Sequence, residues 1–186
     1  VYKIQGGISM NTPNKITIGR IILVPVFMVL LYLDFPYWAL AVYIIACMSD
    51  LIDGRIARKY NLVTDFGKFM DPLADKMLVL SAMCYFVEVG LMPGWVVAVV
   101  LLREFGVSGL RLLAVEQGIV IAAAWSGKIK TGVTMVALGI LIIATQPWFP
   151  APQVVAVICW VLILVTTLYS GIEYFVKNIN VFKHCA

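Results

Sequence analysis

The sequence predicts an all-α integral membrane protein with six transmembrane helices and both termini in the cytoplasm. Composition is the first reason. The 186 residues are 62% hydrophobic and 13% charged, with a mean hydropathy of +0.98, which is far too apolar for a soluble domain. The second reason is that apolar runs close to the ~20 residues that cross a bilayer recur along the chain. The third is that basic residues fall on alternate connections between these runs.

Short connections join the first three predicted spans. The first span runs from Ile16 to Leu33, after Thr12-Pro13, a pair that suits a helix cap followed by a first-turn proline. The second covers about Trp38 to Arg58. A polar connector, residues 59–64, leads to the third span, from about Phe66 to Gly90.

Prolines and polar residues separate the last three predicted spans. Pro93, in a Met-Pro-Gly break, precedes the fourth span, which runs from about Trp95 to Glu116. A polar connector from Gln117 to Lys130 follows. The fifth span covers about Lys130 to Ala144, and after three further prolines the sixth runs from about Val154 to Val176.

The distribution of charge predicts the orientation in the membrane. Six spans place both termini on one side. All 14 lysines and arginines belong to the terminal segments or lie in and around the second-to-third and fourth-to-fifth connections, whereas the opposite loops hold only Asp34 and Glu88. The positive-inside rule therefore makes both termini cytoplasmic, in a multi-pass protein of the cell membrane. Residues 10–186 form one domain. Residues 1–9 precede Met10, fit no later pattern and are expected to be a remnant of an added segment or a disordered arm.

The stretch from Ser49 to Lys76 concentrates acidic residues between two apolar runs. It holds half of the ten acidic residues of the chain: Asp50, Asp53, Asp65, Asp71 and Asp75. Carboxylates at membrane depth are costly, so such a cluster predicts a functional site. The first pair is three residues apart and the last pair four apart, so on helices each pair projects from one face. Because a short connector joins the two helices, the pairs can face each other.

Four close carboxylates require positive charge to compensate their repulsion. The only histidine is His184 and the cysteines form no CxxC pair, so hard oxygen ligation of Mg²⁺, Mn²⁺ or Ca²⁺ is favoured. Two such metals would suit phosphoryl chemistry. Gly54 would allow a phosphate to approach the backbone, and Arg58 is a natural phosphate ligand. The alternative is that these acids are solvated and neutralised by nearby lysines and arginines. For Asp65, at the junction between this connector and the third span, that alternative is preferred.

Basic residues of the fourth and fifth spans form a second group. Arg103 and Glu104 lie about eight residues into the fourth span, and Arg111 follows two turns later near the same face. Lys128 and Lys130 open the fifth span. The group predicts a cationic surface for a second substrate that carries its own phosphate. The alternatives are an ion pair within or between helices, a side chain that snorkels towards water, and lysines that are only positive-inside anchors.

The acidic stretch resembles the CDP-alcohol phosphotransferase family of integral membrane enzymes. The pattern D-x-x-D-G-x-x-A-R-x8-G-x3-D-x3-D is met without a gap from Asp50 to Asp75. The resemblance implies that Asp50 and Asp71 bridge two divalent cations and that Asp53 holds one of them. It also implies that Asp75 completes the second metal site and acts as the base toward the acceptor alcohol. From the ligand chemistry we expect these cations to be Mg²⁺, with Mn²⁺ as the alternative.

The resemblance also implies substrate contacts. Gly54, Arg58 and Thr64 match positions that contact the CDP part of the lipid donor, and Asn14 and Thr17 match a stretch near the donor headgroup. From Met10 to Lys183 the sequence is most similar to bacterial members that use sn-glycerol 3-phosphate, through motifs such as T-P-N-K-I-T-x-x-R, R-E-F-G-V-S-G-L-R and G-K-I-K-T. In those members the positions of three basic residues are expected to hold the acceptor's phosphate: Arg103, Arg111 and Lys128.

The expected function is transfer of a phosphatidyl group from CDP-diacylglycerol to glycerol 3-phosphate, by a homodimer that contacts membrane lipids and binds no nucleic acid. One alternative is a sibling enzyme with inositol phosphate, serine or phosphatidylglycerol as acceptor. A remote alternative is a cation or proton transporter that uses the intramembrane acids. A transporter predicts carboxylates spread along a path across the bilayer, whereas here they gather at one face.

Overall fold

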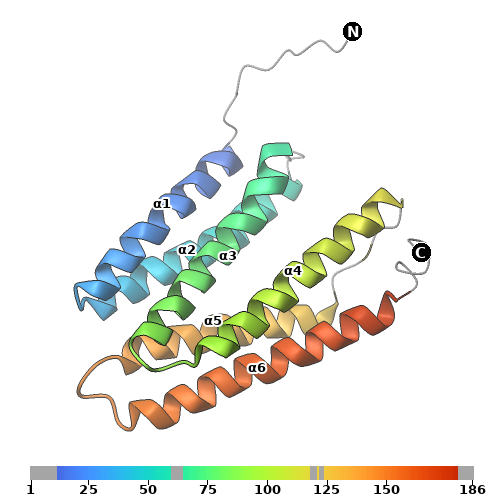
Figure 1. The fold of residues 1–186 in the computed structure, drawn as a ribbon. Coiled ribbons are helices and arrows are strands. Elements are labelled where there is room, and N and C mark those ends of the chain that lie inside the picture. Colours follow the sequence, from blue (N-terminus) through green and yellow to red (C-terminus); the bar gives the residue numbers. More distant parts are fainter. Residues whose placement is uncertain (1–11, 60–64, 118–120, 122–123, 180–186) are drawn as a thin grey trace. The chain divides into compact units, whose positions relative to one another are not determined.

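The computed structural model describes residues 12–59, 65–117, 121 and 124–179, and within its helices it leaves out the side chains of residues 12–16, 50–59, 65–72, 75 and 116. The described chain is all-helical, without a strand, and six helices follow one another (Figure 1). This confirms the predicted helical class and the number of helices. The helices are α1 (Thr12–Tyr32), α2 (Pro36–Lys59), α3 (Asp65–Glu88), α4 (Gly94–Glu116), α5 (Trp125–Ala144) and α6 (Pro152–Lys177).

Most helix boundaries lie within a few residues of the predicted ones, and the largest difference is the start of α5. This helix begins at Trp125, whereas the sequence predicted a connector as far as Lys130. The prediction was wrong here because it treated Gly127 as a loop residue. Gly127 instead lies in the first turn of α5, where its carbonyl accepts a hydrogen bond of 3.0 Å from Thr131 Oγ1. Lys128 and Lys130 are therefore helical residues with defined faces.

The chain divides into two compact units, residues 1–81 and 82–186. In the first unit, α1 packs against α2 as a hairpin (Figure 1). A tight turn joins them, in which Asp34 takes a left-handed conformation (φ 57°) and the Phe35 amide donates to the Leu30 carbonyl at 2.9 Å. The rings of Phe27 and Tyr43 pack 5.8 Å apart between the two helices. Both side chains are buried, so apolar contact between the two helices stabilises the hairpin.

In the second unit, α4 and α5 both pack against α6 (Figure 1). Trp95 of α4 meets Trp160 of α6 edge to face, with ring centroids 5.8 Å apart. At the other end of the α4–α6 contact, the ring of Phe175 lies over Gly106, where a Cβ would come within 3.1 Å of Phe175 Cζ. Glycine thus permits the two helices to approach closely at the end that carries the basic residues.

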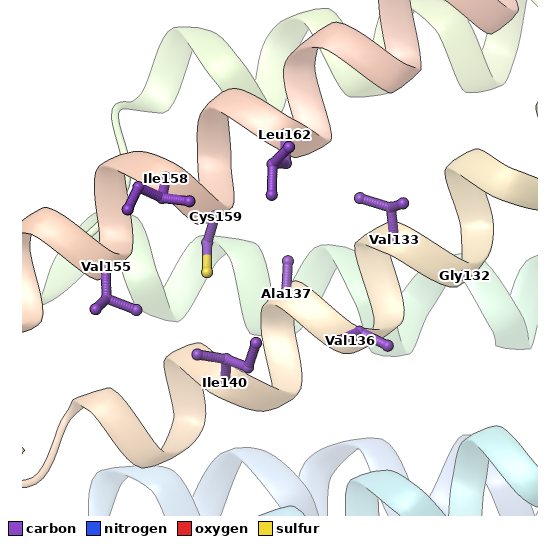
Figure 2. A pocket seen from close by; sticks show the side chains of 9 residues that line it. All are labelled: Gly132, Val133, Val136, Ala137, Ile140, Val155, Ile158, Cys159 and Leu162. Carbon is purple, nitrogen blue, oxygen red and sulfur yellow. The ribbon is translucent and has the colours of Figure 1, made fainter.

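Helices α5 and α6 are each long and apolar enough to cross a membrane. In the apolar segment of α5 only 39% of the residues are buried, and in that of α6 only 33%. Most of the apolar surface of both helices therefore faces outward. Exposure of such an apolar surface to water is unfavourable in free energy, whereas contact with lipid tails is not. An apolar pocket of about 420 Å³ lies between these two helices, and Figure 2 shows the side chains that line it. It is lined by Gly132, Val133, Val136, Ala137, Ile140, Val155, Ile158, Cys159 and Leu162.

These features describe a membrane protein, while six spans and cytoplasmic termini stay predictions. Within the described residues, α1 and α2 contribute shorter apolar stretches, Thr17–Tyr32 and Pro36–Ser49. Charged residues near the middle of α4 interrupt its apolar run.

Candidate active site

The four aspartates of the predicted metal site occupy helical positions in the first unit. Asp50 and Asp53 lie in the last third of α2, and Asp71 and Asp75 lie in the first half of α3. All four aspartates therefore lie on helical backbone, while the metal site that they were predicted to form stays a prediction. The side chains of all four lie outside the described residues. Of the residues predicted to contact the donor, only the helical backbone is described for Asn14, Gly54 and Arg58. Thr64 lies outside the described residues altogether.

Metal ligation by other residues has no support in the described part of the chain. Among the side chains that the structure describes, no group of three or more His, Cys, Asp or Glu could hold a metal ion. The predicted carboxylates are not among these side chains. A donor set of carboxylates without histidine or thiolate is the set that Mg²⁺ and Mn²⁺ prefer.

Thr17 and Arg20 give α1 a buried polar face. Thr17 is 0% exposed and Arg20 is 1% exposed. They are three residues apart and therefore lie on one side of the helix. The sequence predicted Thr17 near the donor headgroup but assigned Arg20 no role at the site. A fully buried guanidinium in an apolar helix is a functional candidate, and its spacing from Thr17 was the signal that could have identified it.

In the second unit, Glu104 joins two of the predicted basic residues. Glu104 Oε1 accepts hydrogen bonds from Arg103 Nη1 and from Lys130 Nζ, each at 2.8 Å. The three side chains are 18%, 13% and 7% exposed, respectively. This confirms the ion-pair alternative for Arg103 and Glu104 and extends it to α5. Because Lys130 is buried and bonded to a carboxylate, it neutralises Glu104 and is not an open phosphate ligand.

The Arg103 side chain packs against a glycine of each neighbouring helix. A Cβ at Gly171 of α6 would lie 3.1 Å from Arg103 Cγ, and one at Gly127 of α5 would lie 3.6 Å from Arg103 Nη2. Arg103 Nε is buried and has no hydrogen-bond partner among the described atoms. Within the described part of the chain, the guanidinium therefore keeps donor capacity that Glu104 does not use.

Arg111, two turns further along α4, contacts α6 through Tyr174. Its Nε donates a 2.9 Å hydrogen bond to Tyr174 Oη, and its guanidinium carbon lies 5.5 Å from the centre of the tyrosine ring. Tyr174 is 2% exposed and belongs to a small core with Val107 and Leu110, whereas Arg111 is exposed. The sequence suggested no role for Tyr174, because the two residues are 63 positions apart.

Lys128 is the most accessible lysine at the start of α5. Its Nζ lies 4.7 Å from the centre of the Trp125 ring, a cation–π contact within the first helical turn. The structure thus brings Arg103 and Lys130 to the same oxygen of Glu104, and it places Arg103 beside the glycine that precedes Lys128. It leaves Arg111 and Lys128 exposed, which suits recognition of an anion that arrives from water.

The pattern of aspartates and the helical membrane fold identify the class. The chain belongs to the CDP-alcohol phosphatidyltransferase family, whose model matches residues 10–169. That segment contains every predicted site residue: the four aspartates, the predicted donor contacts and the three basic residues of α4 and α5.

Curated relatives cover nearly the whole chain. A CDP-diacylglycerol–glycerol-3-phosphate 3-phosphatidyltransferase of Bacillus subtilis is 42% identical, across 93% of this chain and 97% of its own length. A probable phosphatidylglycerophosphate synthase of Mycobacterium tuberculosis is 36% identical, across 91% of this chain and 82% of its own. A protein of Shigella flexneri with the same name as the Bacillus protein is 35% identical, across 89% of this chain and 93% of its own.

Proposed function

We propose that this chain transfers the phosphatidyl group of CDP-diacylglycerol to sn-glycerol 3-phosphate and thereby forms phosphatidylglycerophosphate and CMP. The observation that carries this proposal is the near full-length likeness to relatives that are named for this reaction. The basic residues of α4 and α5 support the choice of a phosphorylated acceptor. A serine acceptor would bring no phosphate for Arg111 and Lys128 to bind.

The carboxylates of α2 and α3 would hold two divalent cations, with Mg²⁺ preferred. Asp50 and Asp71 would bind both ions, Asp53 would bind one, and Asp75 would complete the second site. When bound there, the metals would supply positive charge against the developing negative charge of phosphoryl transfer. Hard carboxylate oxygens and the lack of histidine in this stretch support this ligand set.

Asp75 would act as the general base. It removes the proton from the 1-hydroxyl of glycerol 3-phosphate, and the resulting oxygen attacks the β-phosphorus of the donor. A new P–O bond forms to glycerol as the P–O bond to CMP breaks, and CMP leaves with the electron pair. Gly54, Arg58 and Thr64, with Asn14 and Thr17 of α1, would hold the CDP headgroup.

Arg103, Arg111 and Lys128 would hold the acceptor's phosphate. Arg111 and Lys128 are exposed basic side chains, and Arg103 Nε has no hydrogen-bond partner among the atoms that the structure describes. Arginine can bind two phosphate oxygens at once, whereas lysine contributes a point charge. Lys130 has a different role from the one predicted for the group, since Glu104 neutralises it.

The enzyme would be a multi-pass protein of the cell membrane, with its active site and both termini in the cytoplasm. The concentration of lysine and arginine on alternate connections supports this orientation. A cytoplasmic site suits a water-soluble acceptor, while the donor is itself a membrane lipid. The homodimer is proposed only because the resemblance to the family implies it.

A comparison of acceptors tests the proposal. The purified protein in detergent is supplied with CDP-diacylglycerol and Mg²⁺, and CMP release is measured with each acceptor in turn: glycerol 3-phosphate, inositol phosphate, serine and phosphatidylglycerol. We expect release with glycerol 3-phosphate alone, and none when EDTA replaces Mg²⁺. Release with inositol phosphate but not with glycerol 3-phosphate would refute the assignment. Equal release without any acceptor would indicate hydrolysis instead of transfer.

A further inference from the structure

One face of α6 contacts both arginines of α4. Gly171 and Tyr174 are three residues apart and therefore share a side of the helix. The stem of Arg103 packs on Gly171, and Arg111 is hydrogen-bonded to Tyr174. We infer that Gly171 and Tyr174 are positioning residues that orient the two arginines and so determine affinity for the phosphorylated acceptor. This inference rests on the proposed function.

Tyr174 selects which edge of the Arg111 guanidinium faces a ligand. A guanidinium has five N–H donors in one plane, and the Nε donor of Arg111 is directed to Tyr174 Oη. The end formed by the two Nη atoms then stays available for two phosphate oxygens. Tyr174 is buried, so its hydroxyl is a fixed acceptor, whereas Arg111 is an exposed side chain with many rotamers. Holding this side chain before the ligand arrives reduces the entropy lost on binding.

Gly171 leaves room for the Arg103 side chain next to α6. A Cβ at position 171 would lie 3.1 Å from Arg103 Cγ, which is closer than ordinary side-chain contact. The reverse contact, Phe175 over Gly106, has the same closest approach of 3.1 Å. These two contacts fix the distance between α4 and α6 and the position of one helix along the other. A side chain at position 171 would push Arg103 away from its bond with Glu104.

The first test is Tyr174→Phe, which removes only the accepting hydroxyl. Steady-state kinetics of the full-length protein in detergent, with CDP-diacylglycerol and Mg²⁺, would be measured against glycerol 3-phosphate. We expect KM for glycerol 3-phosphate to rise by about three- to tenfold, the effect of losing one net hydrogen bond. The value of kcat and the KM for CDP-diacylglycerol should stay within about twofold. Tyr169→Phe is the matched control, because Tyr169 is on the same helix and 66% exposed, and it should leave all three constants unchanged.

The second test asks whether Tyr174 acts through Arg111. In an Arg111→Ala background, Tyr174→Phe should raise the acceptor KM no further, since the group that it positions has gone. The same rise in both backgrounds would overturn the inference, as would an unchanged KM in the single variant. Thermal unfolding of each variant shows whether the fold is retained.

The third test compares two glycine substitutions. Gly171→Ala should raise the acceptor KM, whereas Gly109→Ala on α4, whose Cβ would meet no atom within 4 Å, should not. Equal KM values for the two variants would overturn the role of Gly171. If the unchanged protein releases no CMP with glycerol 3-phosphate, the proposed function itself fails. If it does so and Tyr174→Phe leaves KM unchanged, only the inference fails.

Discussion

Neutralising Glu104 should destabilise the second unit by leaving two cations close together. Arg103 Nη1 and Lys130 Nζ each lie 2.8 Å from Glu104 Oε1, so the two nitrogens are at most 5.6 Å apart. Two unit charges at that distance repel by about 3 kcal/mol at an effective dielectric constant of ~20. All three side chains are less than a fifth exposed, so water screens this repulsion only weakly. Glu104→Gln keeps the shape of the side chain and removes the charge, and we expect it to cost about 3 kcal/mol.

Thermal unfolding in detergent would measure this cost. For a chain of this size, about 3 kcal/mol corresponds to a lowering of Tm by about 6–12 °C. Glu173→Gln is the matched control, because it breaks another carboxylate–lysine pair, with Lys177, whose side chain is 65% exposed. Surface pairs contribute little, so the control should leave Tm nearly unchanged.

A double-mutant cycle would show whether the effect belongs to the bridge. Lys130→Met removes one cation and leaves Glu104 bonded to Arg103. In the double variant Glu104→Gln/Lys130→Met, no pair of cations remains, so the loss should be smaller than the sum of the single losses by about 2 kcal/mol. Strictly additive losses, or a Glu104→Gln variant as stable as the Glu173→Gln control, would refute this reasoning.

Three further predictions concern the reaction. Asp75→Asn should lower kcat by at least about 10²-fold while donor binding is largely retained; near-normal turnover would exclude Asp75 as the base. Arg111→Ala should raise KM for glycerol 3-phosphate by about 10- to 100-fold with a smaller change in kcat, and an unchanged acceptor KM would leave Arg111 as a membrane anchor only. EDTA should abolish CMP release and added Mg²⁺ should restore it; activity that persists in EDTA would contradict the two-metal proposal.

The sequence was sufficient for the order and number of the helices. Apolar runs separated by proline and polar breaks are local signals, and each helix of the structure corresponds to one predicted span. The start of α5 was the exception. Gly127 looked like a loop residue because its intrinsic helix propensity is low. In the structure it lies beside Arg103, where the lack of a side chain is useful, so tertiary packing outweighs propensity.

The helical backbone around the four aspartates could also be predicted from sequence. Their spacings of three and four predict a shared face within each helix, because this follows from the geometry of a single helix. The partners of the basic residues could not be predicted in this way. Lys130 is bonded to a carboxylate 26 positions earlier, and Arg111 to a tyrosine 63 positions later. From the sequence alone, Lys130 belonged to the cationic group and its partner was unknown.

The sequence by itself determined the helical class, the acidic pattern of α2 and α3, and membership of a family that acts on CDP-alcohols. These follow from composition and from spacings within single helices, which need no knowledge of neighbouring helices. Only the tertiary structure decided which basic residues are neutralised and which stay open to an anion. That outcome depends on the register of α4 against α5 and α6, where glycines at 106, 127 and 171 let the helices and the Arg103 side chain approach closely. Contacts of this kind join residues far apart in the chain, so no local pattern encodes them.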